Sequence, residues 1–401
     1  MPGLSALRRL GRALALASLT LGYAAAAAEP PLTVEIVFVS HARPPSPPYV
    51  LDPPPPGEGF DGAKLALQEN ATTGAFLNQV FDLQNVELGE DDKPAEAVKP
   101  LLAQGKKLFV SALPAQETLA LADALKAQGA LLFNAGAQDD FLRGAECRPN
   151  LFHTAPSRAM LTDALFQYLA VRRWSKILLV PGPNADDLAD ADAVRAAAKK
   201  FGAKIVAEKP WTFGPLARAR SDAITQAEAL TFARGVEADM IVVADEAEDF
   251  GDYILYRTSE PRLVAGTQGL TPVSWHPTHT AYGAEQLQNR FLRMTKRRMR
   301  PIDYQAWIAV RAIGEAVTEL RDADPQKIAA TLQGPNFTLA IFKGAAASFR
   351  PWDRQLRQAI LLAQPKSLIG LAPQPGFLHQ RNTLDTLGVD ETESACKSGK
   401  P

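Results

Sequence analysis

The feature that most constrains the fold is an alternation of short β-branched runs with longer amphipathic stretches, which occurs twice along the chain. The first series has strand patterns and helical patterns in turn, at 33–39, 62–71, 80–88, 95–103, 107–110, 115–128 and 130–134. The second series repeats the alternation at 158–172, 176–180, 188–201, 204–207, 221–234 and 240–244. Alternation of this kind is typical of parallel sheets covered by helices on both faces. The sequence therefore predicts an α/β protein with two doubly wound parallel-sheet lobes.

The region after the second series predicts how the lobes are joined. Long helical patterns occupy 284–299 and 304–320, and short strand patterns follow at 347–349 and 359–362. No Gly/Ser linker separates the two series near 154–158, which favours a hinge crossed several times over a single linker. We therefore expect one lobe to comprise residues 29–155 and 283–323, and the other to comprise 156–282 and 324–401.

The N-terminus has the three parts of a secretory signal. A basic stretch ends at Arg12, an apolar run covers 13–23, and a tract of small residues ends at Ala28. A membrane anchor is the alternative reading, but it needs about 20 apolar residues, and this run is shorter. We expect residues 1–28 to be a signal peptide that is cleaved near Ala28.

The charge balance argues against nucleic acid as a general partner. Residues 1–28 contain three arginines and no acid, so the remaining chain has 40 basic and 44 acidic residues. A weakly acidic body lacks the positive surface that binds phosphate backbones. Elsewhere in the sequence no apolar run is long enough to span a membrane, so stable membrane insertion is not expected.

The two cysteines, Cys147 and Cys396, predict one disulfide in an exported chain. Two free thiols remain the alternative. A bond between them would close a loop of about 249 residues, which restricts the unfolded chain by ~5 kcal/mol at most. It would hold the C-terminal tail against the body of the protein.

A proline-rich segment follows the first predicted strand directly. Residues 41–60 contain eight prolines, among them the run Pro53 to Pro56. Proline fixes φ and lacks an amide hydrogen, so we expect an extended loop there. Ligands bind at the carboxyl ends of strands in open α/β sheets. The segment could line such a site or contact an aromatic-lined partner, and a surface loop is the third interpretation.

The common signatures of catalysis are absent from the sequence. There is no Gly-x-Gly-x-x-Gly after a strand, no phosphate loop, no Gly-x-Ser-x-Gly elbow and no His-Glu-x-x-His. His276 and His279 flank Pro277, which favours a loop over a metal-binding helix face. We therefore predict a protein that is not an enzyme and that needs no cofactor or metal.

Two acidic clusters have competing interpretations. Asp186, Asp187, Asp190 and Asp192 lie around the start of the predicted helix 188–201, where negative charge complements the helix dipole. A second cluster follows the strand 240–244 and comprises Asp245, Glu246, Glu248, Asp249 and Asp252. Its spacing does not match an EF-hand. Ligand contact by Asp245 or Glu246, and cation binding by the cluster, both remain open.

Several segments resemble, in order, those of periplasmic substrate-binding proteins of the branched-chain amino acid (type I) class, which serve ABC transporters. These segments are Val34 to Val39, Gly62 to Asn70, Phe152 to Ser157 and Phe349 to Asp353. A narrower likeness, to the subgroup associated with pyrroloquinoline quinone (PQQ)-dependent alcohol oxidation, lies in Asn70 to Leu77, Cys147 to Thr154, Ala244 to Ala247, Gly266 to Gly269 and Gly376 to Gln380.

The resemblance implies the type I periplasmic binding fold with a hinge of several crossings, a Gram-negative periplasm and a permease partner. The implied function is to bind a small molecule between the lobes for an ABC importer linked to PQQ-dependent alcohol catabolism. A periplasmic sensor or accessory protein of the oxidation system, in contact with a protein partner, is the alternative.

The resemblance also implies where ligand contacts lie, at the strand ends of both lobes. The residues at these positions are Ser111, Ala112, Asn134 and Ala135 in the first lobe and Asp245, Glu246, Gln268 and Trp275 in the second. Phe133, Trp211 or Trp275 would cover an apolar ligand body. The Gly- and Ser/Thr-rich turn that holds an amino acid in the wider class is replaced by Ser40 to Pro45. Recognition of an α-amino acid is therefore not implied.

Overall fold

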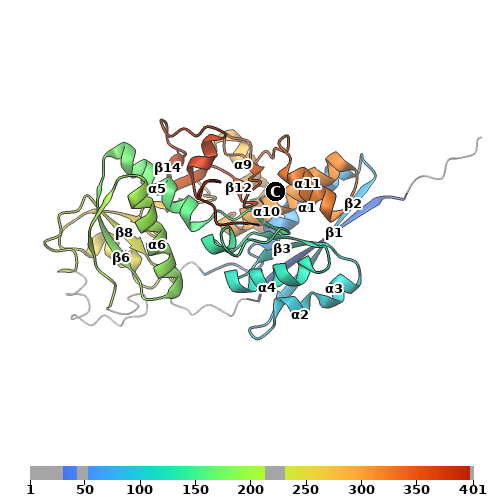
Figure 1. Cartoon of the computed structure of the whole chain (residues 1–401), viewed down its shortest axis with the longest axis horizontal. Helices are drawn as coiled ribbons and strands as arrows, with labels where there is room; N and C mark the ends of the chain where they lie inside the picture. Colours follow the sequence, from blue (N-terminus) through green and yellow to red (C-terminus); the bar gives the residue numbers. More distant parts are fainter. Residues whose placement is uncertain (1–29, 43–52, 213–230, 398–401) are drawn as a thin grey trace, which may run out of the picture. The chain divides into compact units, whose positions relative to one another are not determined.

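The computed structural model describes residues 30–42, 53–212 and 231–397. The chain divides into two units, Met1–Pro31 and Leu32–Pro401, and the description below concerns the second (Figure 1). The predicted signal peptide, 1–28, lies outside the described residues, as does most of the predicted helix 221–234.

The first sheet contains a strand whose middle part is buried on both faces. Its order is β2-β1-β3-β4-β5 and every pairing is parallel. Val34 and the run 36–39 of β1 are at most 1% exposed, as expected of a strand covered on both faces. The strands are β1 (Leu32–His41), β2 (Gln79–Leu88), β3 (Leu108–Ala112), β4 (Leu131–Asn134) and β5 (Leu151–His153).

Helices cover both faces of this sheet because alternate residues of β1 point to opposite sides. Ile36 and Phe38 pack in one core cluster with helices α1 and α10, whereas Val37 and Val39 pack in another with α4. Figure 1 shows α1, α10 and α11 above the sheet and α2, α3 and α4 below it. These helices, with α9, are α1 (Phe60–Gly74), α2 (Pro94–Ala97), α3 (Lys99–Ala103), α4 (Ala115–Lys126), α9 (Ala284–Thr295), α10 (Pro301–Leu320) and α11 (Pro325–Gln333).

The second sheet repeats this arrangement on a smaller scale. Its order is β7-β6-β8-β9, again entirely parallel. Leu179 and Val242 face a cluster with α5 and α6, whereas Val180 and Val243 face a cluster with α8. Its elements are α5 (Arg158–Arg172), β6 (Lys176–Pro181), α6 (Ala185–Lys200), β7 (Lys204–Glu208), β8 (Met240–Ala244), α8 (Gly251–Arg257) and β9 (Leu263–Gly266). The prediction of two parallel α/β sheets is confirmed.

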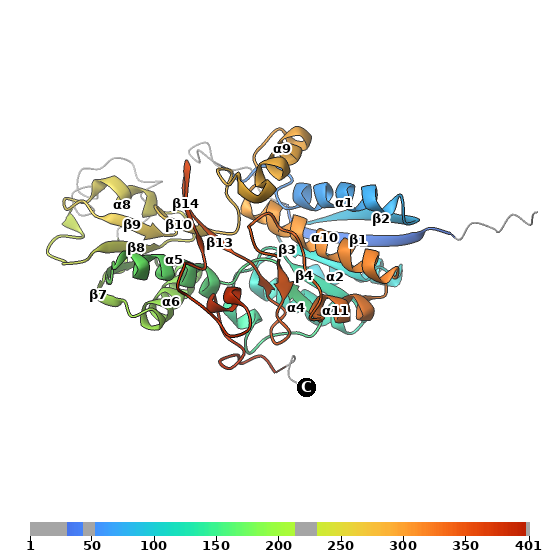
Figure 2. The same cartoon turned by 90° about the horizontal axis from the view of Figure 1, so that it is seen from above.

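Antiparallel strands from the last part of the chain complete the structure. The sheet β10-β13-β14 packs against α5, and Figure 2 shows its strands beside that helix. The predicted strands near 347–349 and 359–362 are present as β11 and β13. The elements are β10 (Thr271–Val273), β11 (Ser348–Phe349), β12 (Leu356–Arg357), β13 (Ile360–Gln364) and β14 (Ser367–Ala372), with short 3-10 helices at Asp140–Leu142, Ala281–Gly283 and Thr383–Thr386.

Three chain crossings connect the two parallel sheets and bond to one another. They follow β5, β10 and β12. Thr154 Oγ1 in the first crossing donates to the carbonyl of Gln305 in α10 (2.9 Å), and Gln358 Nε2 in the third donates to the carbonyl of Thr154 (2.8 Å). Gln305 Nε2 in turn donates to Ser274 Oγ in the second crossing (2.8 Å). The hinge predicted to have several crossings is therefore a buried hydrogen-bonded junction.

The packing of α11 differs from the predicted division of the chain, which assigned 324–401 to the second lobe. Ile328, Leu332 and Leu339 belong to the core cluster around β1 and α10. The amphipathic face of α11 is buried there, and this burial, more than the position of the crossing, decides where the segment packs. We propose that the first lobe extends to about residue 357, where β12 ends and the third crossing begins.

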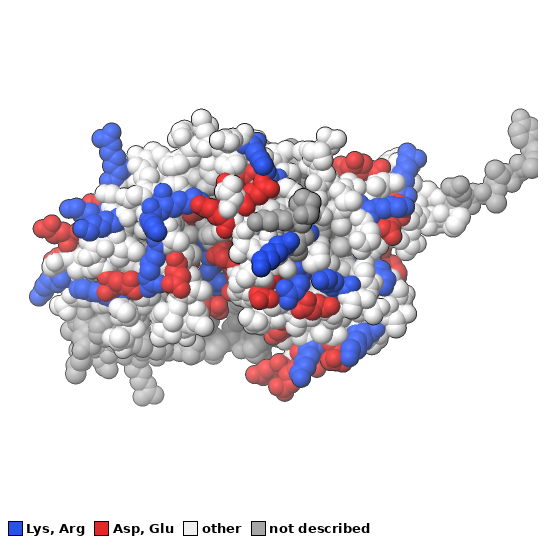
Figure 3. All heavy atoms as spheres, viewed as in Figure 1, with Lys and Arg blue, Asp and Glu red and all other residues white. Residues whose placement is uncertain are grey.

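The predicted disulfide is present between Cys147 and Cys396, which are 249 residues apart. Cys396 is fully buried, so the bond holds the tail against the first lobe beside β5. No described helix combines the length and apolar character needed to cross a membrane. On the face drawn in Figure 3, basic and acidic side chains are interspersed, which agrees with the nearly balanced charge of the chain.

Candidate functional site

A cavity of about 620 Å³ lies at the carboxyl edge of the first sheet. The ends of β1 and β3 contribute Ser40, His41 and Ala112 to its wall. Parallel strands that end at one edge present their last side chains to the same space, which is where ligands bind in open α/β sheets. The rest of the lining comes from the loops, namely Ala42, Pro53 to Pro56, Gly57, Glu58, Phe60, Glu87 and Pro114.

His41 ends β1 and is held in one orientation by two acceptors. Its Nε2 lies 2.6 Å from Glu117 Oε2 in the first turn of α4, and its Nδ1 lies 3.2 Å from the carbonyl of Gly89. The ring is part-exposed, with 24% of its side chain accessible, so it can contact a ligand from this fixed position.

The proline segment supplies the opposite wall of the cavity. Four consecutive prolines, 53–56, line it, and they present ring carbons and carbonyl oxygens without a single amide hydrogen. Two further amides of the lining are used within the protein, since Ala42 N donates to Leu88 O (2.8 Å) and Glu58 N donates to Pro55 O (3.3 Å). The interpretation that this segment lines the site agrees with the geometry for 53–57, whereas residues 43–52 lie outside the described part.

Of the four candidate residues in the first lobe, only Ala112 lines the cavity. Ser111 and Ala135 are fully buried, and Ser111 Oγ has no hydrogen-bond partner among the described residues. Asn134 is also fully buried, and its side chain holds the turn after β4. Its Nδ2 donates to Ala137 O (2.7 Å) and its Oδ1 accepts from Ala137 N (2.8 Å). These residues shape the edge of the sheet, and Ala112 reaches its surface.

In the second lobe, Asp245 organises the loop that follows β8. Its carboxylate accepts hydrogen bonds from the amides of Asp249 (3.0 Å), Phe250 (3.0 Å) and Gly251 (2.7 Å). Burial raises the pKa of this carboxyl, while the three amides act in the opposite direction. Gln268 Nε2 donates to the carbonyl of Asp245 (3.3 Å). Both candidates thus have protein partners that account for their polarity.

Glu246 belongs to an ion-pair cluster centred on Arg158, a residue that the sequence argument did not select. Arg158 begins α5 just after the first crossing, and its side chain is 5% exposed. Its Nε lies 2.8 Å from Glu246 Oε1, its Nη1 lies 2.8 Å from Asp139 Oδ1 and its Nη2 lies 3.2 Å from Asp186 Oδ1. A cation in the first turn opposes the helix dipole, so its position was a signal that it needs anionic partners.

A buried carboxyl, that of Asp190, lies near the cluster around Arg158. Desolvation, with a smaller contribution from the charge of Glu246, raises the pKa of Asp190 to about 7. The nearby Asp187 is fully buried and accepts from the amides of Glu246 (2.7 Å) and Asn184 (3.0 Å). The acids predicted to complement the dipole of α6 therefore also connect that helix to the loop after β8.

The aromatic residues expected to cover a ligand pack inside the protein. Trp275 is 1% exposed and stacks on Tyr304 of α10 with 4.2 Å between ring centroids, and Trp211 stacks on Phe250 at 4.7 Å. Phe133 is fully buried against Phe152. The sequence identified large apolar side chains near the strand ends, but only packing shows that they face the core.

The predicted loop around the two histidines is confirmed. His279 Nε2 lies 2.8 Å from the carbonyl of Phe342, and His276 Nδ1 contacts Thr278. Among the described residues there is no group of three or more His, Cys, Asp or Glu side chains placed to hold a metal ion.

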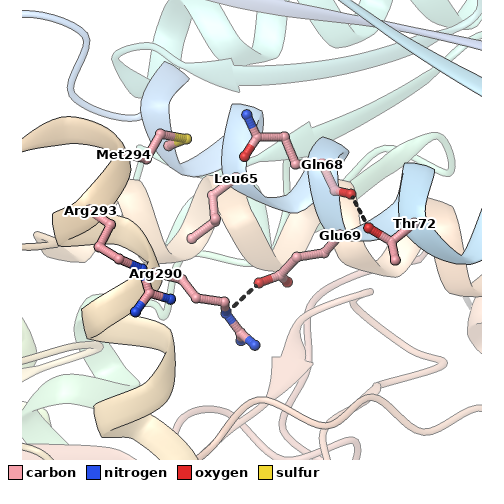
Figure 4. A pocket seen from close by; sticks show the side chains of 7 residues that line it. All are labelled: Leu65, Gln68, Glu69, Thr72, Arg290, Arg293 and Met294. Atoms are coloured by element: carbon pink, nitrogen blue, oxygen red, sulfur yellow. Dashed lines mark hydrogen bonds and ion pairs between the residues drawn. The ribbon is translucent and has the colours of Figure 1, made fainter.

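A second, shallower cavity of about 460 Å³ lies between α1 and α9 (Figure 4). Its polar groups bond mainly to each other. Glu69 Oε1 lies 3.0 Å from Arg290 Nε, and Glu69 Oε2 accepts from Trp307 Nε1 (2.9 Å). Thr72 donates to the carbonyl of Gln68 (2.9 Å). This self-paired surface is a weaker candidate for a ligand site than the cavity at the edge of the first sheet.

Comparison with solved structures supports the fold. A branched-chain amino acid ABC transporter periplasmic ligand-binding protein from Burkholderia xenovorans is 14% identical over 92% of this chain and all of that one, with a TM-score of 0.70. A Streptococcus pneumoniae branched-chain amino acid transporter substrate-binding protein in complex with isoleucine is 15% identical over 84% and 98%, with a TM-score of 0.63. An R. palustris solute-binding protein in complex with benzoate is 12% identical over 91% and 99%, also with a TM-score of 0.63.

A search of curated proteins finds no match to this chain. The family model described as periplasmic binding protein matches residues 57–367, from the cavity wall through the second parallel sheet to the last antiparallel strands. The fold, two parallel α/β sheets joined by three crossings, is that of type I periplasmic binding proteins. This chain therefore belongs to the periplasmic binding protein family.

Proposed function

We propose that this protein is the periplasmic substrate-binding component of an ABC importer and binds a small molecule between its two lobes. The observation that carries the proposal is the cavity of about 620 Å³ at the carboxyl edge of the first sheet, in a chain whose two sheets are joined by three crossings. A hinge of this kind permits closure around a ligand. The structural relatives include proteins described with isoleucine and with benzoate, which are ligands of a size that such a cavity accommodates.

The finer proposal links the ligand to PQQ-dependent alcohol oxidation. Its support is the likeness of the five sequence segments named above. One of these segments begins at Gly266, which has a φ of 107° and lies so close to β8 that an added Cβ would be 2.1 Å from the carbonyl of Val243. The requirements of the fold are thus sufficient to explain that glycine. The link to PQQ-dependent alcohol oxidation must be tested by ligand screening.

For ligand contacts, we propose Ala112 together with Ser40 and His41 from the first lobe, and Glu246 from the second. Ser111, Asn134, Ala135, Asp245, Gln268 and Trp275 have buried positions, and we propose that they support the binding surfaces without contacting the ligand. The distinction follows from burial, since a side chain with no exposed surface reaches a ligand only if the loop around it opens.

The test combines thermal unfolding with small-angle scattering on the mature protein. Alcohols, aldehydes and acids of the oxidation pathway, PQQ and branched-chain amino acids form the panel. A ligand that binds only the folded state adds about 2.7 kcal/mol at 100 times its Kd. We expect one compound to raise Tm and to lower the radius of gyration. If no compound in the panel raises Tm or lowers the radius of gyration, the proposal of an importer component that closes around its ligand is contradicted.

The alternative, a sensor or accessory protein, is favoured by one observation. Pro53, Pro54 and Pro56 are exposed at the rim of the cavity, where they could meet a protein partner. Deleting residues 44–56 separates the two functions. Loss of ligand binding supports the importer proposal, whereas intact binding with loss of a protein partner supports the accessory role. Steady-state turnover of any panel compound would contradict both, because it would make the protein an enzyme.

A further inference from the structure

The charged side chains that line the cavity at the edge of the first sheet are mainly carboxylates. Its ionisable lining residues are His41, Glu58 and Glu87, and none of the described residues that line it is Lys or Arg. Glu117, which holds His41, brings another carboxylate next to the wall. A carboxylate ligand would therefore meet two or three like charges and a single histidine that already has an acidic partner.

The two lining glutamates differ in how far the protein neutralises them. Glu58 is nearly buried, with a side chain 6% exposed, and lies 3.8 Å from Arg300 Nη1. Glu87 is exposed, and no ion pair to it is present in the described part of the chain. Glu87 is the register partner of Ser40 across the β1–β2 pairing, so the two side chains lie on one face of the sheet. Their position supplies acceptors for a ligand that donates hydrogen bonds.

The backbone groups that line the cavity also offer more hydrogen-bond acceptors than free donors. A ligand carboxylate is usually held by amide hydrogens, but prolines 53–56 have none, and the amides of Ala42 and Glu58 already donate within the protein. Proline carbonyls are acceptors, and proline rings are apolar. The wall thus suits a donor head and an apolar body.

The carboxyl edge of the second sheet also has an excess of negative charge. Arg158 faces two carboxylates there, those of Asp186 and Glu246, and also that of Asp139, which comes from the loop after β4 in the first lobe. The side chain of Asp186 is 69% exposed, so part of this negative charge reaches the surface. A ligand between the two edges would meet negative charge from both sides.

We propose that the ligand is a small organic cation, an amine with an apolar body, and that carboxylates, α-amino acids included, are disfavoured. The inference rests on the proposed function, because it takes the cavity to be the ligand site. Glu87 is the direct partner of the ammonium group, Ser40 and the proline carbonyls accept its remaining hydrogens, and the proline rings and Phe60 contact the hydrocarbon part.

Titration calorimetry with matched pairs tests the ligand class. Isoamylamine is compared with isovalerate, and benzylamine with benzoate, so that each pair shares its hydrocarbon and differs in the charged group. We expect the amine of each pair to bind at least tenfold more tightly, and its affinity to fall as salt is raised. Tighter binding of the carboxylates would overturn the inference and leave the importer proposal in place.

Three variants locate the charge that matters. Glu87→Gln should weaken amine binding roughly tenfold, the usual magnitude for a hydrogen bond to a charged group. Glu87→Lys should abolish it. Glu90→Gln changes the net charge equally at an exposed position outside the cavity, and it should leave binding unchanged. Equal effects of the two glutamine variants would overturn the assignment of Glu87.

A separate readout distinguishes failure of the ligand class from failure of the proposed function. Scattering is recorded on the same samples with each amine. Binding of an amine without any change in the radius of gyration supports the ligand class and contradicts the importer role. Absence of binding by both members of both pairs would overturn the proposed ligand class.

Discussion

The carboxyl edges of the two parallel sheets occupy equivalent places in their lobes, yet they use polar side chains in different ways. At the second edge, Asp245 satisfies three backbone amides and Arg158 faces three carboxylates, all within the protein. At the first edge, the lining includes Glu87, an exposed carboxylate, and a wall of prolines. Buried polar groups need partners. The second edge is therefore a preorganised support, whereas at the first edge Glu87 has no ion pair to a described residue, and we propose that it binds the ligand.

The largest expected effect tests the support at the second edge. Arg158→Ala would leave three carboxylates without their shared cation, and Glu246 is only 27% exposed. Removing one partner of a buried ion pair costs about 3–5 kcal/mol. We expect a loss of that size in the free energy of unfolding, measured by urea denaturation at pH 7.

The matched control for this variant is Arg195→Ala. Arg195 has two acidic partners, Asp192 and Glu208, against three for Arg158, and its side chain is 37% exposed. Surface ion pairs contribute about 1 kcal/mol or less. A loss at Arg195 as large as that at Arg158 would show that the second edge is no more dependent on its ion pairs than the surface is.

The next effect is a pH dependence that comes from the second edge. Burial and the charge of Glu246 raise the pKa of Asp190 from 3.8 to about 7, and Arg158, Asp187 and Asp140 also face this carboxyl. A raised carboxyl pKa means that the folded state binds the proton more tightly. The stability from this group is therefore full below pH 3.8 and is lost as pH rises through about 7.

Asp190→Asn should remove this dependence, because the amide stays neutral. The variant should match the wild type near pH 4 and exceed its unfolding free energy by up to about 4 kcal/mol at pH 8. Urea denaturation at pH 4, 6 and 8 measures the difference. If the difference in unfolding free energy between variant and wild type is the same at all three pH values, the raised pKa of Asp190 is contradicted.

A smaller pair of effects compares the two edges directly. Asp245→Asn replaces a carboxylate that accepts from three amides, and hydrogen bonds to charged groups contribute about 1.5–3 kcal/mol. We expect a loss of about 2 kcal/mol. Ser111→Ala removes a buried hydroxyl whose Oγ has no partner in the described residues, so its effect should lie within about 0.5 kcal/mol of zero. Similar losses at both positions would remove the contrast between the edges.

The smallest expected change in stability is at the proline wall. Pro54→Ala alters an exposed rim residue and should change the free energy of unfolding by less than about 1 kcal/mol. The same variant should weaken ligand affinity measurably, since it alters a surface that we propose contacts the ligand. A variant that is destabilised but binds normally would indicate that the prolines serve the fold and not the site.

The sequence predicted much of the fold because buried positions recur along it with the period of a strand or a helix. The apolar run of β1 and the alternation with helical patterns were sufficient to predict parallel sheets, and two cysteines in an exported chain were sufficient to predict their bond. The end of the first lobe was harder to predict from the sequence. Ile328 and Leu332 form an apolar helix face, but a face does not specify which sheet will cover it.

The candidate site was predictable as a place but not as a set of contacts. Ala112 lies at the predicted strand end and lines the cavity, whereas Asn134 and Asp245, at equivalent strand ends, bond within their own loops. Trp275 was expected near a ligand and stacks instead on Tyr304. A residue type at a strand end indicates which chemistry is available, but not whether protein groups already use it.

By itself, the sequence determined the two series of strands and helices, their order along the chain and an extended proline segment after the first strand, because periodicity and proline content are local properties. Only the tertiary structure decided that Arg158 pairs with Asp139, Asp186 and Glu246, and that Glu87 lies opposite Ser40 with no ion pair to a described residue. These arrangements join residues from distant segments. Desolvation and pairing at such junctions depend on neighbours that only folding brings together.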